Sequence, residues 1–299
     1  HIDDYAADII RKHEKTRQDK EDDRTRHALA LNANSGPVFL TYRDTRALDE
    51  LVAGATGANP PLYDFTADDG VRHTVWRVEG EAAPWTAAFA ALPMAYVADG
   101  HHRAKAAFRA GMERRAADPG HTGGEEYNWF LAVLFPQSHL RILPYNRCVA
   151  DLNGMTTSEF LRRVRQTFTV APAATPAPDG PRRTHMYLDG AWYALSWESF
   201  AADPVAVLDV SVLQDRLLRP LLGIDDPRTS PRISFVGGIR GTDELKRRVD
   251  QGPDAVAFSM HPCTVRQMMD IADAGQIMPP KSTWFEPKLR SGLLIHELA

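Results

Sequence analysis

The stretch that most constrains this chain is a short apolar run followed directly by an Asp-Gly turn and a helical pattern. Residues 94–98 (Met-Ala-Tyr-Val-Ala) predict a buried strand, and apolar residues recur at helical spacing across residues 101–111. Asp99 is a good N-cap for that helix, and Gly100 lets a ligand approach the backbone closely. The stretch therefore predicts a strand, a tight turn and a helix that starts at the turn.

The same turn carries the side chains expected of an anion site. A helix N-terminus attracts anions because its first N–H groups have no partner within the helix and its dipole is positive there. His101, His102 and Arg103 follow the turn, and an arginine can grip a phosphate with two parallel hydrogen bonds. Each residue alone has a simpler explanation, as a cap or as a solvated side chain. Together they predict a phosphate-binding turn, which specifies an anion but not a reaction.

A second polar cluster lies near the start of the chain. His13, Glu14, Lys15 and Arg17 fall just before a charged segment, residues 19–31, that predicts a helix. Glu14 could accept a proton from a hydroxyl group, and Lys15 or Arg17 could meet a phosphate. The sequence does not separate these roles from one another.

Two more groups of residues suit a phosphate or a carboxylate. Lys281, Ser282 and Thr283 follow a Pro-Pro pair, and they offer one amine and two hydroxyls without the glycines of a Walker A loop. Asn146 and Arg147 lie in a strand interrupted by a proline, where they could point into a site at the strand end. Residues 281–283 are equally well explained as a structured turn. Asn146 and Arg147 are equally well explained as a strand-end hydrogen bond and a surface charge.

Composition narrows the classes of function. The chain of 299 residues has a net charge of −4, so bulk electrostatics give no argument for nucleic acid. Its cysteines, Cys148 and Cys263, are too few and too far apart for a disulfide framework or a zinc site. No run is long enough to span a membrane and no signal peptide is visible, so we expect a cytoplasmic protein. The chain begins at His1 without Met, and whether an N-terminal portion is missing, trimmed or disordered is left open.

The order of the expected elements predicts a mixed α/β protein. Residues 233–274 alternate strand, helix, strand and helix, which favours a second small α/β unit. The proline-rich residues 171–181 are the best internal boundary. We therefore expect a core at residues 1–170, a linker at 171–182 and a C-terminal α/β unit at 183–299 that packs back on the core.

The Ala-Asp-Gly-His-His-Arg motif at residues 98–103 resembles the hallmark of a large bacterial and archaeal family catalogued as a conserved domain of unknown function. The resemblance continues in four further segments, at residues 11–17, 32–39, 142–147 and 278–293. The motif is also similar to the nucleotide-phosphate turn of the ParB/sulfiredoxin fold, which includes the free-serine kinases. The resemblance implies a ParB/sulfiredoxin-like nucleotide-binding core in the first part of the chain.

The leading hypothesis is accordingly a small-molecule phosphotransferase that resembles the free-serine kinases. Phosphates of ATP or ADP, with Mg²⁺, would lie on the N–H groups of residues 100–102 and on Arg103. Glu14 or Asp99 would accept the proton of a substrate hydroxyl, and His101 or His102 would stabilise the transferring group. His13, Asn146 and Arg147 are the substrate-binding candidates, the ligands of a metal are unknown, and the basic and hydroxyl groups listed above would contact phosphate.

Two alternatives stay open. One is a phosphatase of a phosphorylated amino acid such as phosphoserine, and the other is a nucleotide-binding regulator without catalysis. Zinc hydrolysis and a serine-hydrolase elbow are disfavoured because their motifs are absent from the sequence. We expect a small substrate and a nucleotide as partners, with neither nucleic acid nor membrane, and leave open whether the protein forms a homodimer.

Overall fold

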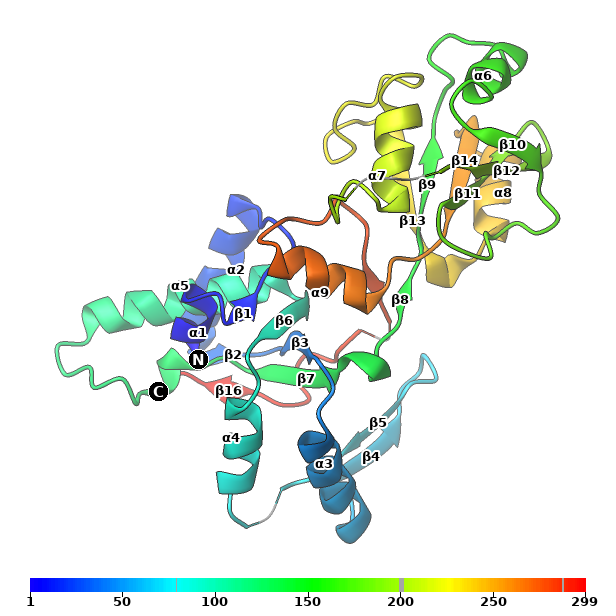
Figure 1. Cartoon of the computed structure of the whole chain (residues 1–299). Helices are drawn as coiled ribbons and strands as arrows, with labels where there is room; N and C mark the ends of the chain where they lie inside the picture. Colours follow the sequence, from blue (N-terminus) through cyan, green and yellow to red (C-terminus); the bar gives the residue numbers. More distant parts are fainter. Residues whose placement is uncertain (79, 199–201, 287) are drawn as a thin grey trace. The chain divides into compact units, whose positions relative to one another are not determined.

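The chain forms two compact units in a computed structural model that describes residues 1–78, 80–198, 202–286 and 288–299 (Figure 1). One unit comprises His1–Leu140 together with Pro287–Ala299, and the other comprises Arg141–Glu286. Each unit combines helices with a β-sheet, so the mixed α/β class predicted from the sequence is confirmed.

The first unit is built on a four-stranded sheet with the strand order β1-β6-β3-β7. Strand β6 runs parallel to β1 and antiparallel to β3, and β3 runs parallel to β7. The elements of this unit are α1 (Ile2–Ala6), β1 (Ile10–Arg11), α2 (Gln18–Leu31), β2 (Ala33–Asn34), β3 (Val38–Tyr42), α3 (Arg46–Ala58), β4 (Tyr63–Thr66), β5 (Arg72–Val75), α4 (Ala83–Ala90), β6 (Ala95–Asp99), α5 (His101–Ala117), β7 (Ala132–Pro136) and β16 (His296–Glu297).

The core of this unit lies between the sheet and helix α5. Val38, Leu40 and Val97 are buried against Ala104 at the start of that helix. Alternate residues of a strand point to the same face of a sheet, so the two β3 residues reach this core together. Helices α1 and α2 also pack on α5, and Figure 1 shows the three gathered together beside the sheet. The end of β6 and the start of α5 are thus fixed by buried apolar contacts.

Two local patterns of the first unit are overridden in the structure. The continuous apolar run at residues 129–135 is typical of a central strand, but β7 lies at the edge of the sheet, beside β3. The glycines and prolines of residues 54–61 predict a turn-rich break, but helix α3 continues through Gly54 and Gly57. An isolated helical glycine costs only about 1 kcal/mol relative to alanine, which the rest of the helix can offset. The Asp69-Gly70 dipeptide between two short strand patterns predicts a hairpin, and β4 and β5 form it.

The second unit is built on a six-stranded sheet with the order β10-β12-β11-β14-β9-β13. Strands β13 and β14 both pair antiparallel with β9, which lies between them. The elements of this unit are β8 (Ile142–Leu143), β9 (Tyr145–Val149), α6 (Thr157–Val164), β10 (Thr169–Pro172), β11 (Arg183–Leu188), β12 (Ala191–Ser196), α7 (Asp209–Leu213), β13 (Ile233–Gly237), α8 (Asp243–Asp250), β14 (Val256–Met260), α9 (Val265–Asp273) and β15 (Trp284–Phe285).

Apolar residues cover both faces of this sheet. Met186 and Phe258 point into the larger core, which also takes Phe160 of α6. Their strand neighbours Tyr187 and Ala257 point the opposite way, into a smaller cluster that includes Leu245 of α8. Alternation along each strand therefore places α6 on one face and α8 on the other.

The two units divide the chain differently from the predicted domains. Strand β10 pairs with β12, so the proline-rich residues 171–182 begin in the six-stranded sheet and connect two of its strands. The C-terminal residues return to the first unit, where β16 pairs with β2. The prolines mark a loop within a unit because the strands on both sides of it join the same sheet.

Candidate functional site

The predicted strand-turn-helix is present at residues 95–117. Strand β6 ends at Asp99, Gly100 adopts a left-handed backbone with φ 91° and ψ 30°, and α5 begins at His101. The pairing of β3 with β6 shifts by one residue next to the turn, where Phe39 opposes Asp99 and Leu40 opposes Val97. Such a bulge bends the strand locally and is common beside functional sites.

Asp99 is not the N-cap of α5. That position belongs to Gly100, and no side chain caps the helix. Asp99 instead accepts a hydrogen bond on Oδ1 from the N–H of Gly100 at 2.7 Å, and one on Oδ2 from Nζ of Lys288 at 2.7 Å. The left-handed glycine inserts one more residue between the strand and the helix, so the carboxylate turns away from the first-turn amides. Those amides are left for another acceptor.

Arg103 lies in the first turn of α5 and is half-buried. It donates hydrogen bonds to the carbonyl of Pro37 at 3.4 Å and to Oγ of Ser291 at 2.9 Å, both uncharged acceptors. Within the part of the chain that the structure describes, no carboxylate forms a salt bridge with it. Burial, with Arg24 nearby, lowers its pKa below the ordinary value, although the charge of Asp99 opposes that shift. Burial thus outweighs the favourable effect of the nearby carboxylate.

The backbone at Gly36 passes so close to the Arg103 guanidinium that only a glycine fits at this position. A Cβ at Gly36 would lie 2.0 Å from Nη1 of Arg103 and 2.8 Å from Oγ of Ser291. No side chain fits there without moving the guanidinium. Gly36 and Ser291 were not predicted as site residues. Each lies in a segment that carries the family resemblance, and this was the one feature of the sequence that could have indicated them.

His101 and His13 form a buried pair beneath the turn. Their ring centroids are 4.4 Å apart at an interplanar angle of 85°, and the residues are 4% and 1% exposed. Burial lowers the pKa of His13 to about 4, although the charge of Asp99 opposes that shift. Burial also lowers the pKa of His101 well below its ordinary value, and the two neighbouring histidines add to the effect. Both imidazoles are therefore neutral at pH 7.

Glu14 lies at the exposed side of the histidine pair. Its Oε2 is 3.8 Å from Nδ1 of His101, and its side chain is 55% exposed. A carboxylate in this position can be reached by a substrate and can act as a proton acceptor toward a hydroxyl. The structure thus brings Glu14, His13 and His101 together with the turn, as the sequence analysis anticipated for a single site.

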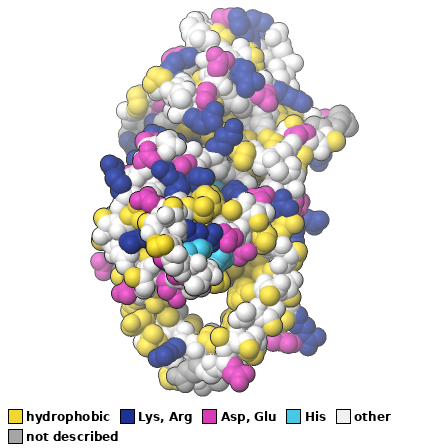
Figure 2. Space-filling view, turned by 90° about the vertical axis from the view of Figure 1, so that its left-hand side faces the viewer, with side chains coloured by type: hydrophobic (Ala, Val, Ile, Leu, Met, Phe, Trp, Pro, Cys, Tyr) yellow, Lys and Arg dark blue, Asp and Glu magenta, His cyan; other side chains and the backbone are white. Residues whose placement is uncertain are grey.

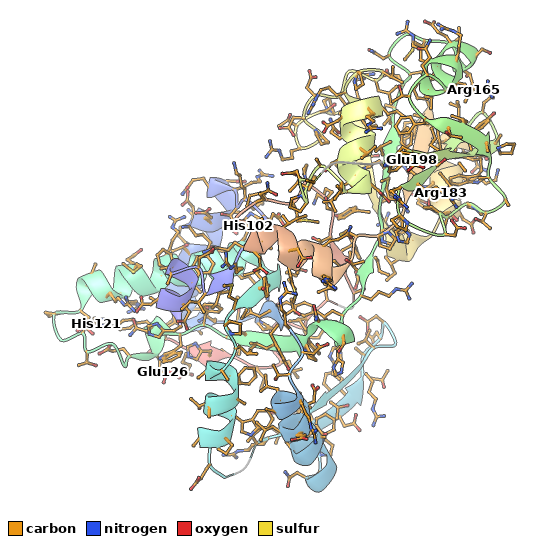
Figure 3. The ribbon with its side chains drawn as sticks, in the orientation of Figure 1. His102, His121, Glu126, Arg165, Arg183 and Glu198 are labelled. Carbon is orange, nitrogen blue, oxygen red and sulfur yellow. The ribbon has the colours of Figure 1, made fainter. Side chains whose placement is uncertain are left out.

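The remaining predicted residues of the first unit surround the same helix start. His102 is half-buried at the start of α5, and its Nε2 accepts a hydrogen bond from the N–H of Arg17 at 3.1 Å (Figure 3). The Arg17 side chain pairs with Asp19 at 2.9 Å and is 71% exposed. Lys15 is exposed. His102 thus connects the first turn of α5 to the segment that carries Glu14.

The other predicted residues belong to the second unit and form a cluster of their own. Arg147 donates to the carbonyls of Tyr145 and Lys281, and burial lowers its pKa to about 10. Asn146 is 2% exposed, and its Oδ1 accepts the N–H of Met260 at 2.9 Å. These contacts join β9 to β14 and to the segment after α9.

The Lys-Ser-Thr turn completes that cluster. Lys281 has a left-handed backbone with φ 56°, and its Nζ lies 5.5 Å from the centre of the Tyr145 ring. Ser282 is 5% exposed and donates to the carbonyl of Pro279 at 2.6 Å, whereas Thr283 is half-buried. The hydroxyl of Ser282 already has an acceptor and the Lys281 ammonium lies over an aromatic ring.

Charges of both signs alternate on the face drawn in Figure 2, where Lys and Arg lie among Asp and Glu. Among the described residues, no group of three or more His, Cys, Asp or Glu side chains could hold a metal ion. None of the described helices is long and apolar enough to cross a membrane.

Fold and site together define a mixed α/β protein in which a strand, a left-handed glycine and a helix meet beside Arg103 and a buried histidine pair. The chain belongs to the family described as "Protein of unknown function (DUF1015)", which matches residues 1–211. The resemblance recognised from the sequence is thereby confirmed, while the motif at residues 278–293 lies outside the matched residues. A comparison with curated proteins gives no match.

Several solved structures are distantly similar. A free serine kinase in complex with AMP shares 11% identity, covers 93% of this chain and 84% of that chain, and has a TM-score of 0.43. SbnI from Staphylococcus aureus, truncated at its C-terminus, shares 11% identity with coverages of 97% and 84% and a TM-score of 0.48. A conserved hypothetical protein from Pyrococcus furiosus shares 12% identity with coverages of 95% and 90% and a TM-score of 0.43. No residue's role follows from likeness at this level.

Proposed function

We propose that this chain is a nucleotide-dependent phosphotransferase that acts on the hydroxyl of a small amino or hydroxy acid. The observation that carries the proposal is the pairing of Arg103 with an uncapped helix. Among the described residues, no carboxylate forms a salt bridge with the half-buried guanidinium of Arg103, and no side chain caps the N–H groups of α5, in whose first turn it lies. Both features are satisfied by one anionic group with several oxygens, and a phosphate is such a group.

The residues present fit the phosphates of ATP or ADP. Gly100 carries no side chain between the turn and a ligand, and a Cβ there would come within 3.7 Å of Cα of Val38. The N–H groups of His101 to Arg103 point out of the helix start, and Arg103 supplies the positive charge. Lys288 forms an ion pair with Asp99 and so offsets the negative charge of that carboxylate beside the turn.

Mg²⁺ would neutralise the charge of the phosphates when bound. Magnesium in phosphate sites is held largely by the phosphates and water, with one or two carboxylates from the protein. The two carboxylates of the described site that could contribute are Glu14 and Asp99. A site of this kind needs no dedicated cluster of three protein ligands, so the residues fit the ion.

In the proposed reaction Glu14 accepts the proton of the substrate hydroxyl as the hydroxyl oxygen attacks the terminal phosphorus. The bond from that phosphorus to the bridging oxygen breaks, and ADP leaves when the donor is ATP, or AMP when the donor is ADP. The carboxylate reaches solvent, where a substrate can approach, and its neighbour His101 is neutral and cannot quench its charge. Arg103 and the first-turn amides hold the transferring group and the leaving phosphate in place. Catalysis of this kind depends mainly on position and charge, and these residues supply both.

Phosphorus NMR tests the proposal directly. Purified protein with Mg²⁺ is incubated with ATP or ADP plus serine, and separately with phosphoserine alone. A nucleotide-dependent phosphomonoester signal is the expected result, and its loss in Glu14→Gln with nucleotide binding retained would assign the base. Phosphate release from phosphoserine alone would replace the proposal with a phosphatase. Nucleotide binding without turnover of serine or any other hydroxy acid offered would replace it with a regulator.

A further inference from the structure

The second unit contains a cavity of about 310 Å³ whose lining residues play no part in the proposed reaction. It forms where the segment before β11, the start of α7 and the segment from β14 to α9 meet. The volume lies at the lower end of the range of roughly 300–1,000 Å³ for ligand pockets. A ligand of amino-acid size therefore suits it better than a nucleotide. The lining residues that bear on its chemistry are Arg182, Val207, Leu208, Asp209, Val210 and Cys263.

Asp209 places a carboxyl group in this cavity. One oxygen, Oδ1, accepts the N–H of Arg182 at 2.9 Å. Within the described ranges, no Lys, Arg or His side chain forms a salt bridge with this carboxylate. Burial raises its pKa to about 6, although the backbone N–H groups of Arg182 and Arg183 and the charge of Arg182 oppose that shift. A cationic group bound in the cavity would favour the ionised carboxylate further.

Arg182, an exposed residue, lines the same cavity. Its backbone is left-handed with φ 59°, and its N–H is the group that binds Asp209. The neighbouring Arg183 forms an ion pair with Asp179, whereas no ion pair forms at the Arg182 guanidinium among the described residues. Arg182 and Asp209 thus line one cavity and form no salt bridge among the described residues, although the charge of Arg182 acts on the carboxylate and its N–H binds it.

The other walls are apolar or neutral. Val207, Leu208 and Val210 contribute aliphatic surface from the start of α7. The thiol of Cys263 donates to the carbonyl of Ser282 at 3.2 Å, and burial raises its pKa to about 12. It is therefore an uncharged wall atom and not a nucleophile.

We propose that this cavity binds an aliphatic α-amino acid, with the ammonium group on Asp209, the carboxylate on Arg182 and the side chain against the valines and Leu208. A purely cationic ligand would leave Arg182 without a partner, and a purely anionic ligand would face Asp209. A zwitterion with an apolar body compensates both charges and fills the apolar walls. The inference does not depend on the proposed phosphotransferase activity.

Equilibrium dialysis of the whole chain with radiolabelled leucine, without nucleotide, tests the proposal. Saturable binding to one site is expected. Isopentylamine and isocaproate each carry one of the two charges on a similar aliphatic body, and each should bind at least about tenfold more weakly, because one charge-assisted hydrogen bond is lost. Absence of saturable leucine binding overturns the proposal, and so does an amine that binds as tightly as leucine.

Substitutions locate the site. Asp209→Asn and Arg182→Gln should each weaken leucine binding at least about tenfold. The matched controls are Asp215→Asn, whose residue is 55% exposed and paired with Arg219, and Arg165→Gln at an exposed position (Figure 3). Val207→Trp should fill the cavity and abolish leucine binding, and it replaces Asp209→Asn in the test if that variant fails to fold. Unchanged binding in Arg182→Gln and Val207→Trp overturns the proposal.

Discussion

His13 and His101 meet edge to face with their ring centroids 4.4 Å apart, in the interior of the first unit. Across the described residues, neither ring nitrogen of His13 has a hydrogen-bond partner, and Nε2 of His101 also lacks one. A proton added to either ring would create a buried charge beside a second imidazole. The pair is therefore stable in its neutral form, and protonation should weaken the fold.

The stability of the protein should consequently fall as the pH falls. The pKa of His13 is about 4 in the folded protein, below the ordinary 6.5, so the unfolded chain binds more protons between these values. The contribution of His13 is fully present above about pH 6.5 and is lost progressively toward pH 4, by on the order of 3 kcal/mol. His101 acts in the same direction. Urea unfolding followed from about pH 7 to about pH 4 measures the loss.

The substitution His13→Phe tests whether His13, and not another titrating group, accounts for the pH dependence of stability. His13→Phe removes one proton-binding group while keeping an aromatic ring, so its stability should depend less on pH than that of the wild type. His27→Gln changes an exposed histidine of α2 and should leave the pH dependence unchanged. Equal pH dependence in wild type and His13→Phe would show that the buried pair does not determine it.

Local patterns in the sequence predicted the strand-turn-helix because its signals are local. The apolar run, the glycine and the helical spacing all lie within residues 94–111, and the structure forms β6 and α5 there. The hairpin at Asp189-Gly190 was predictable for the same reason, since both residues adopt the positive φ values that this dipeptide favours. In both cases residues close together in the sequence were enough to predict the local structure.

The partners of the site were not predictable from the sequence. Lys288 binds Asp99 across 189 residues, and Ser291 binds Arg103 across 188 residues. Nothing in local spacing says that the last residues of the chain return to the first unit. The cap assignment of Asp99 failed for a subtler reason, because a left-handed glycine after a strand is as compatible with the sequence as a capped helix start. Only the backbone conformation decides between them.

Arg103→Gln should weaken nucleotide binding by at least about tenfold, because a charge-assisted hydrogen bond contributes roughly 1.5–3 kcal/mol. The variant keeps a hydrogen-bond donor toward Pro37 or Ser291, so the fold should persist. Isothermal titration with ADP measures the affinity, and circular dichroism checks the fold. Arg26→Gln, at a side chain of α2 that is 80% exposed, is the control. An unchanged affinity in Arg103→Gln would remove this arginine from the anion site.

Glu14→Gln should reduce turnover by about 10²–10⁴-fold, the usual contribution of a general base, with little change in nucleotide affinity. The amide keeps the size of the side chain and removes its ability to take a proton. Glu113→Gln on the exposed face of α5 is the matched control. A loss of nucleotide affinity equal to the loss of turnover would instead assign Glu14 to binding.

Gly100→Ala should destabilise the protein by roughly 1–2 kcal/mol, because an alanine is strained at a positive φ. The turn holds φ at 91°, and both the sheet and α5 fix that conformation through their buried contacts. Gly54→Ala provides the opposite case, since this glycine lies exposed within α3 with open space around its Cβ position. That change should stabilise by about 0.5–1 kcal/mol, and urea unfolding measures both. If Gly100→Ala were as stable as the wild type, the turn would have room to relax, and the amides of α5 could not be held fixed for a phosphate.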